Sequence, residues 1–246
     1  MIIFLNFKSG EPIFMKTNSF LKCFLLGILA SCGQVDESQE VPLIDTSPAD
    51  NCTFQTSGRN SFFVLEPGYR LTLEGMEGSD TIRMIISVLA LTKVVAEVET
   101  RVLEERELVN NELKEISRNF VAFCRETEAV YYFGEEVDFY ENGRISGHEG
   151  EWLADGKNKP GILMPGKYLI GSRYYQEHAP GKAMDRGEII SLTDSLVTPA
   201  GTFHNCLRVR ETSPLEPGAG EYKIHAQGIG LVRDEDLLLV SYGFED

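Results

Sequence analysis

The chain has 246 residues, a formal net charge of −15 at pH 7 and five cysteines. This acidity argues against a nucleic-acid partner, because contact with phosphates needs a basic surface. It also argues against the folded body lying flat on an anionic membrane. The length is sufficient for one domain, or two small ones, with a buried core.

The N-terminal segment has the parts of a bacterial export signal. Lys16 and Lys22 supply a basic start, and residues 24–29 form a short apolar core. This core is too short to cross about 30 Å of hydrocarbon as a helix. The sequence Leu-Ala-Ser-Cys at residues 29–32 follows and reads as a lipobox, the recognition sequence for lipid attachment.

We therefore expect residues 1–31 to be removed as a signal peptide, with Met15 as the true start of translation. Cys32 would become the acylated first residue of the mature protein and would hold it on a membrane. The alternatives are a secreted protein without lipid and a cytosolic protein with a buried N-terminal helix. Residues 32–51 are polar and aperiodic, which predicts a disordered tether. Gly33 is not acidic, which favours the outer membrane or the cell surface.

From residue 52 to residue 246 the sequence predicts a single β-rich domain. The segment 93–106 has a helix-forming composition, but its apolar period of two favours a strand. Reversals are predicted at Asn110-Asn111 and at Asn142-Gly143, where positive φ angles are tolerated. The predicted strands cover residues 69–76, 81–91, 93–106, 113–125, 129–140, 145 onward, 168–177, 188–197, 203–211, 222–226, 231–233 and 237–242.

About ten to twelve strands joined by short loops favour antiparallel pairing. The expected fold class is therefore all-β. We expect an antiparallel curved sheet arranged as a half-barrel or a sandwich.

Three cysteines remain once Cys23 leaves with the leader and Cys32 is acylated. One disulfide is then possible among Cys52, Cys124 and Cys206, with three pairings open. Cys124 and Cys206 lie inside predicted strands, so we prefer that pairing. Three buried thiols are the alternative.

Residues 138–149 have part of the spacing of a calcium-binding loop. Asp138, Asn142 and Glu149 would be the oxygen ligands. Tyr140 stands where a further carboxylate is expected, and the flanking segments read as strands. A tight hairpin with polar edges is the alternative, and no other cofactor is expected.

The densest polar and aromatic set lies between residues 148 and 186. If the strands bring these side chains together, they could line a ligand cleft with acid–base groups and stacking faces. The alternative is that aromatic residues cap the core while charges are solvated, as we also expect for the runs 135–138 and 234–236. The candidate cleft residues are His148, Glu151, Trp152, Tyr174, Tyr175, Glu177, Asp185 and Arg186.

The second half of the chain resembles bacterial envelope proteins of unassigned function. The resemblance rests on YYFGEEVDFYENGRISGHEGEW at residues 131–152, on RYYQEHAPGKAMDRGE at residues 173–188, and on residues 198–237. It covers most of the mature chain. The resemblance implies a β-rich lipoprotein of the cell envelope and no particular activity.

The sequence lacks a Gly-x-Ser-x-Gly elbow, a phosphate-binding loop and a Cys-x-x-Cys pair. We therefore expect a lipid-anchored envelope protein with a non-catalytic binding or structural role. Its partner would be a small apolar or amphiphilic ligand, or another envelope protein. One alternative is a hydrolase with a carboxylate cleft around residues 148–185, and another is a calcium-dependent binding module at residues 138–149.

Overall fold

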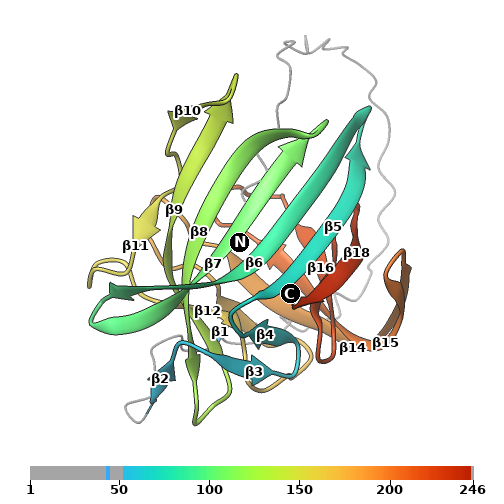
Figure 1. The fold of residues 1–246 in the computed structure, drawn as a ribbon. Coiled ribbons are helices and arrows are strands. Elements are labelled where there is room, and N and C mark those ends of the chain that lie inside the picture. Colours follow the sequence, from blue (N-terminus) through green and yellow to red (C-terminus); the bar gives the residue numbers. More distant parts are fainter. Residues whose placement is uncertain (1–42, 45–51, 245–246) are drawn as a thin grey trace, which may run out of the picture. The chain divides into compact units, whose positions relative to one another are not determined.

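A computed structural model describes residues 43–44 and 52–244 of the chain (Figure 1). All regular elements within these ranges are strands, which confirms the predicted all-β class. Within the same ranges, no helix has the length and apolar character needed to cross a membrane. The predicted signal peptide, the acylation site Cys32 and most of the predicted tether lie outside the described residues.

Sixteen strands form one sheet, and β3 and β4 form a separate small pair. The strands are β1 (Leu43–Ile44), β2 (Phe54–Gln55), β3 (Gly58–Asn60), β4 (Phe63–Leu65), β5 (Tyr69–Glu77), β6 (Asp80–Val95), β7 (Val98–Val109), β8 (Glu112–Cys124), β9 (Val130–Glu141), β10 (Arg144–Gly147), β11 (Trp152–Leu153), β12 (Gly161–Met164), β13 (Arg173–Tyr175), β14 (Arg186–Thr198), β15 (Gly201–Thr212), β16 (Glu221–Ala226), β17 (Gly230–Asp234) and β18 (Leu237–Phe244).

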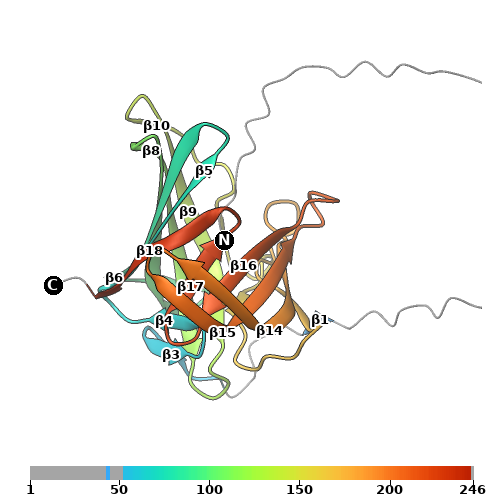
Figure 2. The same ribbon diagram turned by 90° about the vertical axis from the view of Figure 1, so that its right-hand side faces the viewer.

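The order of the main sheet is β1-β13-β14-β15-β16-β17-β18-β5-β6-β7-β8-β9-β10. Strands β5–β10 and β13–β18 are each consecutive antiparallel runs, and the pairing of β18 with β5 joins the two runs. Figure 2 shows β17 and β18 between β5 and the strands β14 and β15. The described strands do not close the sheet, whose ends are β1 and β10.

Two predicted reversals are confirmed by the backbone. Asn110 and Asn111 have φ angles of 51° and 67° and connect β7 to β8. Asn142 and Gly143 have φ angles of 52° and 71° and connect β9 to β10. Positive φ at both central positions matches the right-handed twist of the flanking strands, which is why Asn and Gly signal such turns.

A third reversal was not predicted. Ala96 and Glu97 have φ angles of 49° and 62° and divide the segment 93–106 between β6 and β7. Val95 pairs directly with Val98 across this turn. The prediction of one strand over 93–106 is therefore wrong, because the alternation of apolar and polar residues continues through the turn and neither turn residue is a usual turn former.

Two other predicted boundaries also differ. Leu43–Ile44, inside the predicted tether, forms β1 and pairs in parallel with Arg173 and Tyr174 of β13. The prediction of a tether without structure is wrong for these two residues. Of the predicted strand 168–177, only β13 forms, because Ser172 donates its backbone N–H back to the carbonyl of Leu169 at 3.0 Å and closes a turn.

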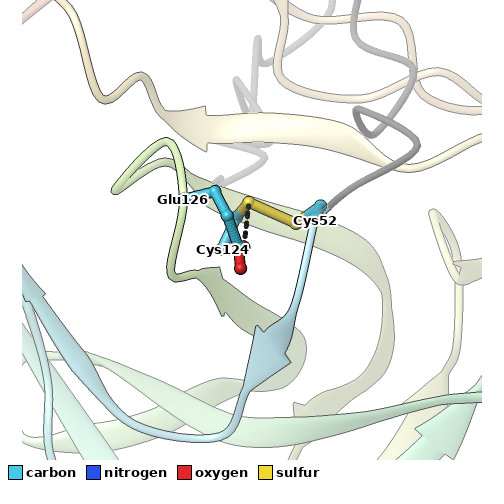
Figure 3. A group of neighbouring side chains, drawn as sticks. All are labelled: Cys52, Cys124 and Glu126. Atoms are coloured by element: carbon cyan, nitrogen blue, oxygen red, sulfur yellow. Dashed lines mark hydrogen bonds between the residues drawn. A yellow bond between two sulfur atoms is a disulfide. The ribbon is translucent and has the colours of Figure 1, made fainter.

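A disulfide joins Cys52 to Cys124 (Figure 3). Cys206 is a buried free thiol. The predicted pairing of Cys124 with Cys206 is therefore wrong. Pairing of β2 with the end of β8 brings the Cα atoms of Cys52 and Cys124 to 5.6 Å, a separation that a disulfide spans. Cys206 lies on β15, which is far from β8 in the order of the sheet.

We expect the double variant Cys52→Ser/Cys124→Ser to lose about 4 kcal/mol of unfolding free energy, because the bond restricts a 72-residue loop in the unfolded chain. Urea unfolding at pH 7 measures the loss. Cys206→Ser, which breaks no bond, is the control. Equal stability of the double variant and the wild type would contradict the assignment.

Candidate functional site

His148 and Glu151 of the predicted cleft lie beside the outer strand pair β9–β10. His148 Nδ1 lies 2.8 Å from the carbonyl oxygen of Val137, and this hydrogen bond raises the pKa of His148. Glu151 accepts a hydrogen bond at 3.2 Å from the backbone N–H of Val137. Both side chains therefore fasten the chain after β10 onto β9, and the His148 side chain is 54% exposed.

The predicted calcium ligands do not converge. Asp138 on β9 accepts a hydrogen bond from Arg118 at 2.8 Å and lies 3.2 Å from His148 Nδ1. Asn142 stands in the turn at the end of β9. It follows Asp138 by four residues of extended chain, so the Cα atoms of the two residues are about 13 Å apart. Oxygens that bind one calcium ion lie about 2.3–2.6 Å from it, so this hairpin does not fit a calcium loop.

Tyr175 and Arg186 form an aromatic and cationic stack at the start of β14. Arg186 donates a hydrogen bond to the Tyr175 hydroxyl at 2.8 Å, and its guanidinium carbon lies 4.8 Å from the ring centroid. The ring of His178 stacks on Tyr175 at 4.7 Å. Tyr174 points to the other face, as adjacent strand residues do, and is fully buried.

Trp152 and Glu177 are the members of the predicted set that meet in the interior. The indole N–H of Trp152 donates to Glu177 at 3.3 Å. Trp152 also pairs in register with Glu135 of β9, and its ring lies edge-on to Tyr132 at 5.4 Å. Glu135 is 1% exposed and Glu177 is 0% exposed. We call Glu135 and Glu177 the acid pair.

The acid pair carries unsatisfied hydrogen-bonding capacity. Within the described part of the chain, Glu135 Oε1 and Glu177 Oε2 are buried without a hydrogen-bond partner. Burial raises the pKa of both carboxyls, and the charge on Glu135 raises that of Glu177 further. Tyr132 donates its hydroxyl to Asn119, which fixes the ring beside Glu135.

Gly134 allows this arrangement because it has a φ angle of 118° and interrupts the regular pleat of β9. A Cβ atom at this position would lie 2.2 Å from the Trp152 carbonyl oxygen. We expect Gly134→Ala to destabilise the protein by about 2–5 kcal/mol through backbone strain and overlap. Fluorescence of Trp152, the single tryptophan, during urea unfolding measures the loss.

Gly143→Ala is the matched control for that change. Gly143 also has a positive φ angle, of 71°, but a Cβ atom there meets nothing within 4 Å. Its substitution tests strain without overlap. Equal losses in the two variants would show that close approach of Trp152 to Gly134 is not what requires glycine.

A second group of buried charges lies on β15–β17. Lys223 Nζ is 2.8 Å from Glu211 and 3.6 Å from Asp234. Gln176 also donates to Glu211, at 2.6 Å. Glu211 and Lys223 are each 5% exposed, and Asp234 is 0% exposed. We call Glu211, Lys223 and Asp234 the ammonium cluster.

The ammonium of Lys223 sets the charge state of its cluster. Burial alone would raise the pKa of Glu211, but Lys223 and the Gln176 hydrogen bond hold it below its ordinary value. Burial would lower the pKa of Lys223, but Asp234 and Glu211 hold it well above its ordinary value. Burial raises the pKa of Asp234 to about 6, against the opposing effect of Lys223.

Gln176 and Glu177, the two residues after β13, connect the acid pair to the ammonium cluster. The backbone N–H groups of Gln176 and Glu177 both donate to the carbonyl oxygen of Asp185, at 2.8 and 3.2 Å. The Gln176 side chain then bonds Glu211, whereas the Glu177 side chain bonds Trp152. Asp185, another predicted cleft residue, is half-buried, and burial raises the pKa of its carboxyl.

Sequence reasoning missed Glu135 and Asp234, because it placed the runs 135–138 and 234–236 on solvated turns. Both side chains are buried instead, so that expectation is wrong for them. The position of Glu135 beside Gly134, inside an aromatic strand, was the available signal. For Asp234, the available signal was Lys223, which is the single lysine or arginine in the short predicted strand 222–226 and therefore a possible buried counter-charge.

Other features do not contribute to this site. A surface pocket of about 550 Å³ is lined by residues 54–57 and 97–99 and contains no predicted cleft residue. Among the described residues, the one group of three or more metal-ligating His, Cys, Asp or Glu side chains is Cys52, Cys124 and Glu126 (Figure 3). Its two sulfur atoms are bonded to each other, so they offer no thiolates.

The fold and the site together define an antiparallel β-sheet protein with ionisable groups in its interior. Comparisons with protein-family models, curated proteins and solved structures found no match to this chain.

Proposed function

We propose that the protein is a lipid-anchored protein of the cell envelope whose β domain binds a small ligand without catalysis. The acid pair is the observation that carries the binding role. Buried polar atoms in proteins are ordinarily hydrogen-bonded, so two neighbouring carboxyls with unpartnered oxygens indicate a place for a ligand's polar group. The lipobox at residues 29–32 supports the anchor.

The chemistry of the described residues supports a non-catalytic role. The neighbours of the acid pair are Asn119, Tyr132 and Trp152, which supply no serine, threonine or cysteine nucleophile. A serine–histidine contact does occur, with Ser195 Oγ 3.0 Å from His204 Nδ1, but both side chains are exposed on β14 and β15. An activated serine also needs a group that orients the histidine and donors that stabilise an oxyanion.

Mass spectrometry of the full chain, purified natively from its host's membranes, tests both halves of the proposal. We expect an N-terminal peptide that begins at Cys32 with attached acyl chains, and a co-purified small molecule in the native spectrum. Cys32→Ala should move the protein from the membrane fraction to the soluble fraction, whereas Cys23→Ala should not. An intact leader on a soluble protein would overturn the anchor, and a ligand-free native spectrum would overturn the binding role.

The second candidate is a carboxylate hydrolase, which the acid pair also favours. Glu177 belongs to the predicted catalytic region, and the charges that raise its pKa are those of Glu135, which the sequence did not indicate, and of Asp185, which it did. Hydrolysis of a glycosidic bond needs two carboxyls that flank the bond, about 5–10 Å apart. Turnover of a chromogenic glycoside that is lost in Glu177→Gln would support this candidate; ligand binding without any turnover would reject it.

A further inference from the structure

The acid pair and the ammonium cluster differ in whether a buried cation accompanies their carboxylates. In the ammonium cluster, Lys223 places a primary ammonium 2.8 Å from one carboxylate and 3.6 Å from the other. The acid pair has no ion pair with any cation of the described residues, although its carboxyls are at least as deeply buried. The chain thus shows, within one sheet, how one ammonium group supplies the counter-charge for two interior carboxylates.

We propose that Glu135 and Glu177 bind the ammonium group of a linear amine, a diamine or polyamine, in the way that Glu211 and Asp234 bind Lys223. This rests on the proposed binding function and names its ligand class. An ammonium has three donors and no acceptor, so it suits two carboxylates that have unpartnered oxygens. The rings of Tyr132 and Trp152 beside the pair keep out water, which strengthens the attraction.

A row of further carboxylates leads toward the acid pair on the same face of the sheet. The register pairs Glu107 with Glu115, the next level pairs Glu105 with Ser117, and Asn119 pairs with Glu135. Residues two apart on a strand share a face, and successive levels lie about 7 Å apart. We call Glu105, Glu107 and Glu115 the carboxylate row.

The carboxylate row is costly for the free protein. Glu107 and Glu115 are direct cross-strand neighbours, so two charged carboxylates there would repel each other, and burial together with the charge on Glu107 raises the pKa of Glu115. All three residues of the row are only half-buried, whereas Glu135 is fully buried, so accessibility decreases along the face toward the acid pair. A ligand with a second ammonium would neutralise the row while its first ammonium occupies the acid pair.

The same geometry argues against a divalent cation as the ligand. Calcium takes six to eight oxygen ligands, and magnesium requires near-octahedral geometry. Among the described residues, neither member of the acid pair belongs to a group of three converging metal-ligating side chains. Two carboxylates and an aromatic wall fit an ammonium better than a hard metal ion.

Isothermal titration calorimetry of the full chain with putrescine and spermidine tests the proposal, at pH 8 and 150 mM NaCl to screen surface attraction. We expect saturable binding that weakens at least tenfold in Glu135→Gln and in Glu177→Gln. Glu136→Gln is the matched control, because its side chain is adjacent in sequence, half-exposed and paired with Lys93. The neutral analogue 1,4-butanediol should not bind.

Melting temperatures of all variants without ligand show whether the substitutions preserve the fold. The inference would be overturned if the wild type gave no heat of binding at millimolar amine. It would also be overturned if both acid-pair variants bound the amine as tightly as the wild type, or if the wild type bound the diol as tightly as the diamine. Binding of calcium in place of amines would overturn it as well. A native spectrum that contains a ligand other than an amine would overturn the inference and leave the proposed binding function standing.

Discussion

Replacing Lys223 with methionine is expected to lower the free energy of unfolding by about 3–5 kcal/mol at pH 7. The substitution keeps the apolar stem but removes the ammonium that lies between Glu211 and Asp234. Two interior carboxylates would then be left without a counter-charge, which costs more than the loss of a surface ion pair. Urea unfolding followed by tryptophan fluorescence measures the change.

The matched control for Lys223→Met is Lys114→Met. Lys114 pairs with Glu112 at 3.0 Å on the surface, and exposed pairs contribute at most about 1 kcal/mol. The triple variant Lys223→Met/Glu211→Gln/Asp234→Asn should recover much of the loss, because no buried charge remains. A loss for Lys223→Met no larger than that for Lys114→Met would show that the ammonium cluster does not stabilise the fold.

The melting temperature is expected to fall as the pH rises from about 5 to 8. Burial raises the pKa of Glu115 to about 8 and that of Glu221 to about 7, and it raises the pKa values of the acid pair as well. The folded state therefore holds protons that the unfolded state has released above its ordinary pKa near 4.5. The contribution of these carboxyls to the free energy of unfolding is therefore fully present below pH 4.5. It is lost as the pH rises through the raised pKa values of the folded state.

His225 has the opposite effect on the pH dependence of stability, and its effect falls in a lower pH range. Burial lowers its pKa from 6.5 to about 4, so the folded state resists protonation and stability falls as the pH drops from 6.5 toward 4. The carboxyls are more numerous, so we expect the maximum near pH 5. Differential scanning calorimetry from pH 4.5 to 8.5 measures the profile.

Glu115→Gln should flatten the alkaline side of this profile, because glutamine holds no proton to release. Glu112→Gln, an exposed carboxyl on the same strand, is the control. A melting temperature that is constant or increases between pH 5 and pH 8 would contradict the buried state of these carboxyls.

Much of the secondary structure could be predicted because its signals are local. Runs of strand-forming residues bounded by turn residues identified β5, β8, β9 and β14–β18 nearly to their ends. Asn110-Asn111 and Asn142-Gly143 identified their turns through residues that tolerate positive φ. The Ala96-Glu97 turn carries no such residues, and it forms because β6 and β7 pair along most of their length.

The candidate site was predicted only in part. Trp152 and Glu177 do meet in the interior, but His148 and Glu151 lie at the β9–β10 edge and Tyr175 and Arg186 stack elsewhere. Glu135 joined the site because Gly134 breaks the pleat of β9, a backbone event that a list of charged residues does not reveal. Cys52 joined Cys124 because a two-residue strand pairs with β8.

By itself, the sequence determined the strand-forming character of the domain and two of its hairpin turns, because both depend on residues that are neighbours in the chain. The tertiary structure decided which charges became buried. Alternation divides a strand into two faces, but only the pairing of β18 with β5 and the path of residues 176–177 determine which face is covered and by which partners. The register of the consecutive strands β15, β16 and β17 placed Lys223 beside Glu211 and Asp234, whereas Glu135 and Glu177 come from distant segments and are buried without a cation.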